Sequence, residues 1–443
     1  MEKPWAELSW QEKREERFKR WLSPPGVKFA SPKAEKVYKE RVTRFYKAFT
    51  VQVPDRVPCM LPTGFYAAAY AGTNLGTVMY DYEEMKRAWR KVMHDFDADS
   101  YVPPALVPPG PSLDAIDYKL YKWPGHGLSK TTLSYQAVEG EWMKPNEYDD
   151  LIRDPSDFWL RTYLPRVFGA FKAFNTLSPW TAFEEIPSTA FLSFGNPEVQ
   201  AGFNAIMKAG TESLKWFGAV AEIIGESLSM GFPGIMSGLA KAPFDTLGDT
   251  LRGTQGLMMD MFQRPQKVHE AMERLTPIAI KGAINAVANA AAPIVIMPLH
   301  KGADSFMSIK QYETFYWPTF KKVVMAQVNE GIIPILFAEG SYNQRLDIIG
   351  DFPKGSVVWY FDQTDIFEAK KKIGDKLCIM GNVPSSLIMT GTPKQVKERC
   401  KQLIEVCGKG GGYVLAAGAN VDEGNPENLR AMMAAAVEYG SYK

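Results

Sequence analysis

The clearest pattern of hydrophobic and polar positions lies in the last third of the chain. Short apolar runs rich in β-branched residues alternate there with segments of helical spacing, such as 309–330 and 393–407. Alternating buried strands and helices predict a parallel sheet. This many units at the end of a long chain favour an α/β fold of the (β/α)8 TIM-barrel type over an open sheet. The runs cover residues 294–300, 332–340, 356–365, 376–384 and 411–420.

The chain before residue 294 carries fewer strand signals. Short strands are predicted near residues 57–61 and 99–102, whereas the Gly/Pro-rich stretch 231–243 predicts a loop between helices. The helical patterns cover residues 81–95, 157–174, 197–227 and 253–290.

One segment precedes the predicted barrel of residues 51–443, and a second is inserted within it. Residues 1–50 alternate charged and aromatic side chains around a surface helix at 12–20, which predicts an N-terminal helical extension. Residues from about 103 to 156 combine Pro and Gly with short extended runs. This stretch predicts a hairpin or loop insertion that serves as a candidate lid.

One uncharged segment, residues 282–299, has about the minimum length of a membrane-spanning helix. It contains Asn285, Asn289 and Pro293, and a proline disfavours helix at the residue before it. The segment therefore predicts the end of a helix followed by a buried strand at 294–299.

Composition and charge are those of an ordinary globular protein. Hydrophobic residues make up 46% and charged residues 23%, and 51 basic against 50 acidic residues leave a net charge of +1. Without an excess of positive charge we expect no nucleic-acid partner and no membrane partner. The four cysteines show no C-x-x-C spacing and the N-terminus lacks the apolar stretch of a signal peptide, so we expect reduced thiols and a cytoplasmic location.

Polar side chains follow four of the predicted strands. The four are His300, Glu339, Asp362 and Asn382. The carboxyl ends of barrel strands meet at one mouth, so these residues predict a site there. A lone histidine is often structural, but this position makes a catalytic or metal-binding role the alternative for His300.

Each of the other candidates has a structural alternative. The apolar run before Glu339 predicts a desolvated carboxyl, which suits a general acid, whereas the alternative is an ion pair with Arg345. Asp362 is the predicted site residue and Asp365 the predicted helix cap. Cys378 lies inside a strand, where a buried and inert thiol is the default.

The C-terminal third carries a family resemblance. Residues 381–440 contain a Gly-Asn strand end, a Gly-Thr-Pro helix start, a Gly-Gly-Gly-Tyr strand start and a Pro-Glu-Asn helix start. With these motifs the segment resembles the uroporphyrinogen decarboxylase superfamily. Weaker similarity extends upstream through APFDTLGDTLRG and DRVPCML to about residue 50. The resemblance implies a (β/α)8 barrel, in agreement with the strand pattern.

The superfamily holds two chemistries, porphyrinogen decarboxylation and cobalamin- or corrinoid-dependent methyl transfer. Its decarboxylases bind substrate carboxylates through an Arg-Gln-Ala-Gly-Arg segment after the first strand. The matching region here, residues 62–68, has no arginine, and the histidine expected near the final strand is Ala419 or Asn420. Carboxylates without arginine partners are costly to bury, so the resemblance disfavours heme-pathway decarboxylation.

The thiol-methylating members hold zinc through His-x-Cys and a later Cys. Here His300 matches the histidine, but Gly302 replaces the first cysteine and Ala419 the second. The resemblance leaves open a zinc site of harder ligands. Its candidate ligands are His300, Glu339, and Cys378 or Asp362.

The resemblance and the strand-end residues together give the functional hypothesis. It is a methyltransferase that moves a methyl group from a small methylated or methoxylated compound, as in O-demethylation, to the cobalt of a partner corrinoid protein. The corrinoid is expected on a partner because the chain has no Asp-x-His-x-x-Gly cobalamin segment. The catalytic candidates are His300 and Glu339, as acids or metal ligands, and Asp362, which would orient His300 or complete the site. The substrate-binding candidates are Tyr66, Tyr342, Arg345 and Asn382.

Two other functions stay open. A decarboxylase acting on a tetrapyrrole or another carboxylated substrate would use Asp362 or His300 for proton transfer. The other is a non-enzymatic protein that binds a corrinoid or tetrapyrrole, with the cavity retained and the catalytic activity lost. An assay of carbon dioxide release distinguishes a decarboxylase from a methyltransferase.

Overall fold

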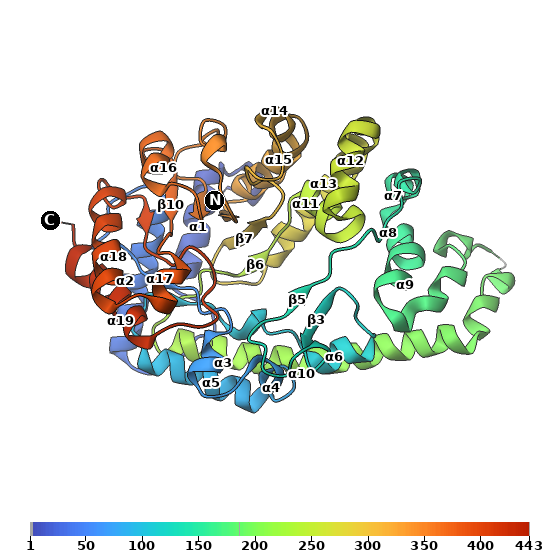
Figure 1. The fold of residues 1–443 in the computed structure, drawn as a ribbon, viewed down its shortest axis with the longest axis horizontal. Helices are drawn as coiled ribbons and strands as arrows, with labels where there is room; N and C mark the ends of the chain where they lie inside the picture. The colour runs from blue at the N-terminus through green and yellow to red at the C-terminus, as the bar shows by residue number, and fades with distance from the viewer. Residues whose placement is uncertain (1–2, 186, 443) are drawn as a thin grey trace.

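A six-stranded parallel sheet lies at the centre of the computed structural model, which describes residues 3–185 and 187–442 (Figure 1). The strand order is β11-β10-β9-β8-β7-β6, and β7 and β8 pair over six residues. The predicted α/β class with a parallel sheet is confirmed. The strands are β6 (Gly238–Leu239), β7 (Ile294–Leu299), β8 (Ile333–Ala338), β9 (Val358–Phe361), β10 (Cys378–Met380) and β11 (Tyr413–Val414).

Two further parallel strands, β1 (Met60–Leu61) and β2 (Ser100–Tyr101), continue the sheet past β11. The backbone N–H of Met60 donates to the carbonyl of Leu415 at 2.9 Å. At the far end of the order, the hydroxyl of Ser100 donates to the carbonyl of Pro233, just before β6, at 2.6 Å. This succession of parallel strands is consistent with the predicted barrel.

Strand β6 corrects one sequence prediction. The Gly/Pro-rich stretch 231–243 was expected to be a loop, yet Gly238 and Leu239 pair in parallel with Val295 and Ile296 of β7. The ladder is only two residues long, and its glycine gives no strand signal. Neighbouring strands, not local propensity, determine this element.

Helices cover the outward faces of most strands. The best-predicted one, α18, matches residues 393–407, because Thr392 and Gln395 form a reciprocal capping box at its start. The helices around the strands are α3 (Tyr66–Tyr70), α4 (Leu75–Val78), α5 (Tyr82–Asp95), α11 (Pro243–Asp245), α12 (Gly253–Gln263), α13 (Pro265–Ala286), α14 (Ile309–Gln311), α15 (Trp317–Asn329), α16 (Ile366–Ile373), α17 (Ser385–Thr390), α18 (Pro393–Cys407) and α19 (Pro426–Tyr439).

The core has two layers because side chains alternate across each strand. Outward-facing strand residues pack against the surrounding helices. Inward-facing ones, such as Ile294 and Ile335, pack in a second cluster with Trp21 and Phe45 of the N-terminal helices α1 (Trp10–Leu22) and α2 (Pro32–Phe49). The helices of the N-terminal segment therefore close the inner core from one end.

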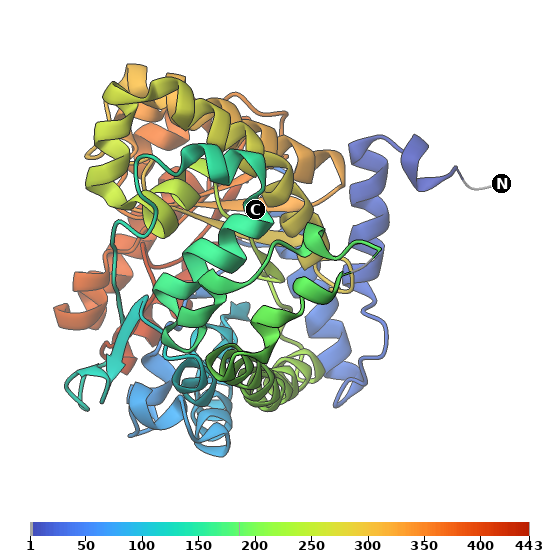
Figure 2. The ribbon, with the colours of Figure 1, turned by 90° about the vertical axis from the view of Figure 1, so that its right-hand side faces the viewer.

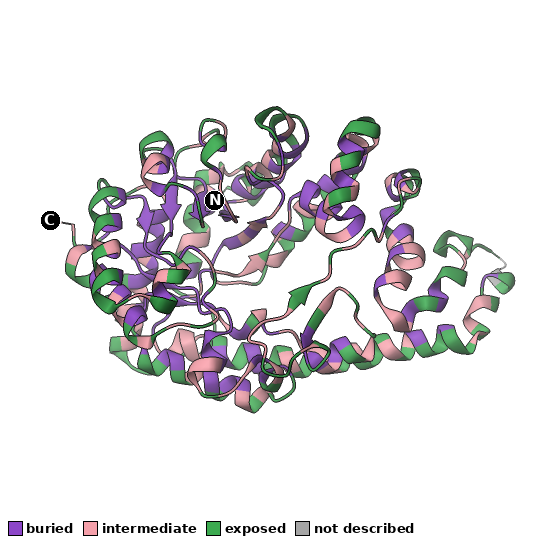
Figure 3. Cartoon of the chain, in the orientation of Figure 1, coloured by how far each residue is buried: buried purple, intermediate pink, exposed green. Residues whose placement is uncertain are grey.

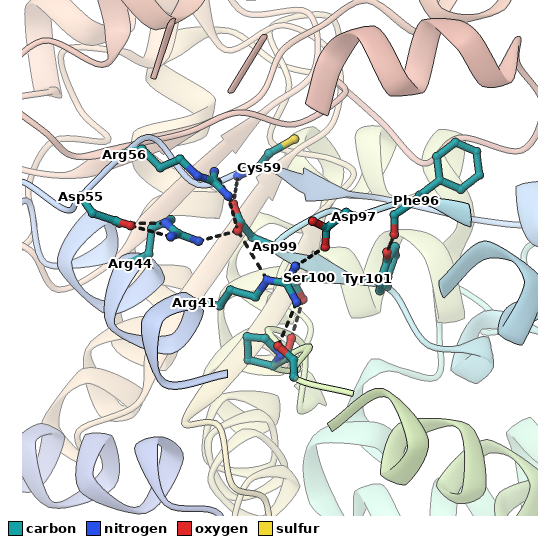
Figure 4. A network of polar contacts seen from close by, with 12 residues as sticks. Arg41, Arg44, Asp55, Arg56, Cys59, Phe96, Asp97, Asp99, Ser100 and Tyr101 are labelled. Atoms are coloured by element: carbon teal, nitrogen blue, oxygen red, sulfur yellow. Dashed lines mark hydrogen bonds and ion pairs between the residues drawn. The ribbon is translucent and has the colours of Figure 1, made fainter. Parts of the chain in front are cut away.

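A buried carboxylate fixes α2 at the amino ends of the strands (Figure 4). Asp99, just before β2, is 1% exposed and accepts hydrogen bonds from Arg44 at 2.6 Å and Arg56 at 2.7 Å. The backbone N–H of Cys59 donates to the same carboxylate at 2.8 Å. Arg44 also forms two hydrogen bonds with Asp55. Because several donors surround it, the charge of Asp99 can be buried here.

The segment between β2 and β6 extends farthest from the sheet (Figures 1 and 2). Strands β3 (Tyr121–Pro124) and β5 (Gln136–Ala137) pair antiparallel in it, as the predicted hairpin requires, and β4 (Gly127–Leu128) pairs with β3. Residues 155–185 and 187–196 form an outlying lobe, and α10 (Pro197–Ser229) runs from that lobe back to the sheet. The remaining helices here are α6 (Gly110–Ala115), α7 (Tyr148–Arg153), α8 (Pro155–Phe158) and α9 (Leu164–Val167).

The uncharged segment 282–299 folds as predicted, since α13 ends at Ala286 and β7 begins at Ile294. Within the described part of the chain, no helix is long and apolar enough to cross a membrane. The helical pattern expected at 157–174 runs without interruption from α8 through the π-helical turn η3 (Trp159–Tyr163) to α9, which contains Pro165. It ends at Phe168, whose backbone is extended, and the chain continues as the 3-10 helix η4 (Gly169–Thr176).

Candidate functional site

A cavity of about 530 Å³ lies at the carboxyl ends of β7 and β8. Its wall is mainly apolar and aromatic. Tyr121 and Tyr135 contribute to it from the hairpin segment, residues 121–139, and their rings stack with centroids 4.4 Å apart. A hollow of this size with few polar groups is typical of a small-molecule site. The polar and charged side chains that line it are Lys241, His300, Glu339 and Asn420, together with the tyrosines at 101, 121, 135 and 360.

His300 and Glu339 reach the cavity because of the two-residue alternation of a strand. Pro298 and Ile296 line the cavity two and four residues before His300. Phe337 and Ile335 line it at the same spacing before Glu339. Each polar residue thus ends the inward-facing row of its strand. The strand-end logic correctly brings these two predicted residues together.

Asp249, on the π-helical turn η8 (Thr246–Arg252), holds the His300 ring. Nδ1 of His300 donates to Oδ2 of Asp249 at 2.6 Å, and Nε2 lies 3.6 Å from Oε1 of Glu339. Asp249 therefore takes the orienting role that the sequence assigned to Asp362. The reason is proximity: η8 lies close to the end of β7, whereas Asp362 accepts a hydrogen bond from the backbone of Gly340.

Two lysines form ion pairs with Asp249. Nζ of Lys241 lies 2.8 Å from Oδ2 of Asp249, and Nζ of Lys301 lies 3.2 Å from its Oδ1. Lys301 also donates to the hydroxyl of Thr254 at 2.8 Å and contacts Glu139 of the hairpin segment at 3.4 Å. The hairpin segment therefore contacts the site through the ion pair of Glu139 with Lys301 and through Tyr121 and Tyr135.

These contacts set the protonation of the site. Burial opposes the charge on His300, but the hydrogen bonds and charges of Asp249 and Glu339 outweigh it and raise the pKa of His300 from 6.5 to about 10. For Asp249, burial is likewise outweighed by His300 and Lys241, which hold the pKa of this carboxyl well below its usual range. At neutral pH the pair is an imidazolium and a carboxylate.

A second carboxylate, Asp245, fixes the backbone after His300. It is fully buried and accepts hydrogen bonds from the backbone N–H of Lys301 at 2.8 Å and the hydroxyl of Tyr316 at 2.7 Å. Burial, together with the nearby charge of Asp249, raises the pKa of Asp245 to about 6. Asp245 therefore positions the end of β7 without reaching the cavity wall.

Asp362 and Asn382 connect neighbouring loops. Burial raises the pKa of Asp362. The side-chain amide of Asn382 donates to the carbonyls of Asp362 at 3.0 Å and Thr364 at 2.8 Å. Asp365 caps α16 by accepting from the backbone of Phe367 and Glu368, so its predicted role as the cap is confirmed. Neither Asp362 nor Asn382 is among the described residues that line the cavity.

The other predicted substrate-binding residues are buried away from the cavity. Tyr342 is 0% exposed and donates to the carbonyl of Leu299 at 3.0 Å, which fixes the residue before His300. Arg345 is 0% exposed and lies 3.7 Å from Asp304, so the ion pair with Glu339 does not form. Tyr66 is 2% exposed and stacks on Tyr70. These side chains support the fold around the site.

Glu339 differs from its prediction. Its side chain is 41% exposed, so the desolvation expected from the apolar run before it is wrong. The run belongs to β8, which is fully buried, but Glu339 stands one residue beyond the strand and opens to the cavity mouth.

Of the predicted zinc ligands, His300 and Glu339 lie together at the cavity wall, but Cys378 does not join them. Cys378 is level with Ile335 through their shared neighbour Val358, four residues before Glu339, which puts it roughly 13 Å lower along the strands. A Cβ at Gly302 would lie 2.6 Å from the hydroxyl of Tyr342, so the place of the family cysteine is filled. Among the described residues, no three His, Cys, Asp or Glu side chains are arranged to hold a metal ion.

Asp249 and Lys241 escape prediction from sequence because both lie far from His300 along the chain, Asp249 by 51 residues. Lys301 directly follows His300, but its partners Asp249 and Glu139 are again remote in sequence. One signal was present. The segment APFDTLGDTLRG holds Asp245 and Asp249 four residues apart, which places two carboxylates on one face of a helical turn.

The fold and the site together define an α/β protein with a six-stranded parallel sheet and polar groups at the carboxyl ends of its strands, which is consistent with a barrel fold. The chain belongs to the uroporphyrinogen decarboxylase (URO-D) family, whose model matches residues 197–439, more than half of the chain. The predicted family is thus confirmed.

Among curated relatives, the chain is 25% identical over 177 residues to uroporphyrinogen decarboxylase of Coxiella burnetii, which covers 40% of this chain and 48% of that protein. It is 28% identical over 224 residues to the enzyme of Saccharophagus degradans, which covers 49% and 60%. The chain thus spans about half the length of the curated relatives it matches.

Among solved structures, the fold resembles a methyltransferase from Methanosarcina mazei with a TM-score of 0.58. The likeness covers 91% of this chain and 98% of that one at 14% sequence identity. Similarity at this identity establishes a shared fold.

Proposed function

We propose that this protein is a methyltransferase that takes a methyl group from a small methylated or methoxylated compound and passes it to the corrinoid of a separate protein. The proposal takes the parallel strands as a closed (β/α)8 barrel with the cavity at its mouth. Family membership, the fold shared with the Methanosarcina mazei methyltransferase and the chemistry of the cavity support it.

The observation that carries the proposal is the chain of charges Asp249, His300 and Glu339. Asp249 holds Nδ1 of the imidazolium, so the second proton, on Nε2, lies toward Glu339 at the cavity wall. An oxygen leaving group is poor unless it is protonated as its bond to carbon breaks. A fixed imidazolium at the wall supplies that proton.

In the proposed step the methyl group moves from the oxygen of the donor to the acceptor. The acceptor provides the electron pair of the new bond to the methyl carbon, and the pair of the broken carbon–oxygen bond stays on the donor's oxygen. That oxygen takes the Nε2 proton of His300, and Asp249 keeps the neutral ring oriented through Nδ1. Glu339, half exposed at the mouth, passes a proton from solvent back to the ring.

The cavity favours a donor with few negative charges. No arginine occurs among the described residues that line it, and its lysine, Lys241, is already paired with Asp249. A substrate with several carboxylates would leave some of them unpaired in a mainly apolar hollow, which costs free energy.

The corrinoid is the methyl-accepting substrate in this proposal, because the chain's residues do not fit a resident one. Among the described residues that line the cavity, His300 is the only histidine, and its two ring nitrogens already face the carboxylates of Asp249 and Glu339. The four cysteines of the described chain are buried and free, which fits a reducing cytoplasm shared with such a partner.

The test mixes the purified protein with a reduced corrinoid protein and a panel of methoxylated and methylated donors, and follows the absorbance of the corrinoid. We expect methyl transfer with at least one donor, and His300→Gln should lower its rate by about 100-fold or more. His126→Gln is the matched control, because His126 lies on the exposed surface outside the cavity and should leave the rate unchanged. No transfer with any donor contradicts the proposal.

Decarboxylation of a carboxylated tetrapyrrole is the second candidate, and the activity named for the curated relatives favours it. Release of carbon dioxide from a porphyrinogen, abolished by His300→Gln and without corrinoid methylation, would establish it in place of methyl transfer.

A further inference from the structure

A second cavity, of about 490 Å³, lies between α10, α5 and the loop before β6. It is called the side cavity below. Its wall is almost entirely apolar, and none of the described residues that line it is charged. The wall residues that matter most here are Trp21, Val102, Phe217, Ile224, Gly225 and Met236.

The side cavity lies where the succession of strands is interrupted. Among the described residues, no backbone hydrogen bond joins β2 to β6. Pro103 follows β2 closely and has no N–H with which to extend a ladder. Tyr101, Val102 and Met236 line both the side cavity and the cavity of the candidate site. The two cavities are therefore neighbours that share part of a wall at this interruption.

Small residues explain why the chain does not fill this space. Gly225 and Gly234 line the side cavity, together with the alanines at 290–292. A Cβ added at either glycine would meet no heavy atom of another segment of the described chain within 4 Å. Phe217 and Ile224 of α10 are 61 and 37% exposed, which places them at the opening of the side cavity to solvent. Helix α10 runs along the lower edge of the molecule in Figure 3, and exposed residues recur along it.

Most polar groups of the wall already have partners within the chain. The hydroxyl of Thr63 and the indole N–H of Trp89 both donate to the carbonyl of Val102, at 2.9 and 3.2 Å. The hydroxyl of Tyr38 donates to the carbonyl of Trp21 at 2.8 Å. One exception is the indole N–H of Trp21, which is buried and has no hydrogen-bond partner among the described residues.

We propose that the side cavity is a binding site for an uncharged apolar small molecule that carries a hydrogen-bond acceptor for the indole N–H of Trp21. This inference does not depend on the proposed activity. A charged ligand is disfavoured because the wall holds no opposite charge and an unpaired charge is costly to bury. An apolar cavity of roughly 150 Å³ holds benzene, so the side cavity has room for two or three rings or a chain of about ten carbons.

The size of the side cavity distinguishes it from an ordinary packing defect. Protein interiors contain few voids larger than a water molecule, because empty apolar space forfeits dispersion contacts. An apolar ligand restores those contacts, and it can enter beside the exposed Phe217 and Ile224. Met236 has a flexible, unbranched side chain and lines both cavities, so an occupant of the side cavity also contacts the wall of the candidate site.

The fluorescence of N-phenyl-1-naphthylamine tests the site, because this uncharged three-ring probe brightens in apolar surroundings. We expect saturable binding of one probe per chain with a dissociation constant of about 1–100 μM. 1-Decanol should displace the probe at a concentration at least about tenfold lower than decanoate, whose carboxylate would be buried without a partner. The absence of saturable binding overturns the proposal. Equal or better displacement by decanoate also overturns it, because the probe would then lie beside the charged Lys241 and His300 of the candidate site.

Two glycine variants on α10 locate the probe. Gly225→Phe fills the opening of the side cavity and should weaken probe binding by about tenfold or more. Gly218→Phe is the matched control, because Gly218 lies on the same helix but is not among the described residues that line the side cavity. A side chain has open space at both positions and glycine is a poor helix former, so both variants should fold. Wild-type binding by Gly225→Phe, or an equal loss in both variants, overturns the proposal.

A second pair of variants uses charge instead of volume. Phe217→Glu with Ile224→Glu places two carboxylates at the opening and should also weaken probe binding by about tenfold or more. Met207→Glu with Leu214→Glu is the control, because these side chains are 62 and 73% exposed on the same helix and are not among the described residues that line the side cavity. Circular dichroism should show the same helix content in both double variants and the wild type. Binding that survives the first pair of substitutions, or is lost with both pairs, contradicts a ligand seated against α10.

Discussion

His300 keeps its proton at neutral pH because two carboxylates outweigh its burial. Asp249 contributes most of that effect through a 2.6 Å hydrogen bond, and Glu339 adds to it from the cavity side. Sequence reasoning found His300 and Glu339 because both end an inward row of a strand. It missed Asp249 because a hydrogen bond between distant segments leaves no local pattern in a sequence.

Replacing Asp249 with asparagine tests the orienting role. Asp249→Asn removes the charge that raises the pKa of His300, so that pKa should fall from about 10 toward 6.5 and methyl transfer should lose its acid at lower pH. The measurements are the pH–rate profile and the NMR titration of the His300 ring, with a rate loss of about 10- to 100-fold expected at pH 8.

Asp362→Asn is the control for that experiment, because Asp362 bonds to the backbone of Gly340 and not to His300. It should leave the titration of His300 nearly unchanged. If Asp362→Asn moved the titration and Asp249→Asn did not, the assignment of the orienting carboxylate would be wrong.

At the scale of elements, long apolar runs and capping residues identified the strands and helices well. Strand β8 and helix α18 match their predictions because a six-residue buried run and a capping box are both local signals. Strand β6 was missed because two residues in a Gly/Pro-rich stretch become a strand only beside β7. The arginine cluster at Asp99, which holds α2 against the strands, gave no sequence signal because Arg44 and Asp99 are 55 residues apart along the chain.

The network at Asp99 predicts a large stability effect. Asp99→Asn leaves the buried Arg44 and the partly buried Arg56 without their shared carboxylate and should lower the free energy of unfolding by about 3–5 kcal/mol. Asp97→Asn is the matched control, because Asp97 pairs with Arg41 but its side chain is 89% exposed, and it should cost less than about 1 kcal/mol. Denaturant unfolding of both variants measures the difference. Equal losses would show that Asp99 is not the anchor.

At the scale of the whole molecule, the amino ends of the strands contribute to stability and the carboxyl ends form the candidate site. The amino ends are closed by α1 and α2 and their charge pairs, and the carboxyl ends carry the cavity. The hairpin segment joins the second end, since Tyr121, Tyr135 and Glu139 all reach the site. This division matches the general rule that barrel stability is concentrated at one end and function at the other.

The charge pair at the site also makes stability depend on pH. The folded pKa of His300 is raised, so its stabilising effect is complete below pH 6.5 and is lost as the pH rises toward about 10. The lowered pKa of Asp249 makes its contribution complete above pH 3.8 and lost in stronger acid. The melting temperature of His300→Gln should therefore fall furthest below that of wild type between about pH 4 and 6.5. A gap that widened toward pH 10 would contradict this assignment.

The sequence by itself determined the class of fold, the family and the two residues that end the inward rows of β7 and β8. These depend on local runs, caps and motifs, which any stretch of chain carries with it. Only the tertiary structure decided which carboxylate holds His300, why Gly302 has no room for a cysteine side chain, and that Cys378 lies far below the cavity. Those facts depend on the distance between segments that are remote in sequence, and folding alone sets that distance.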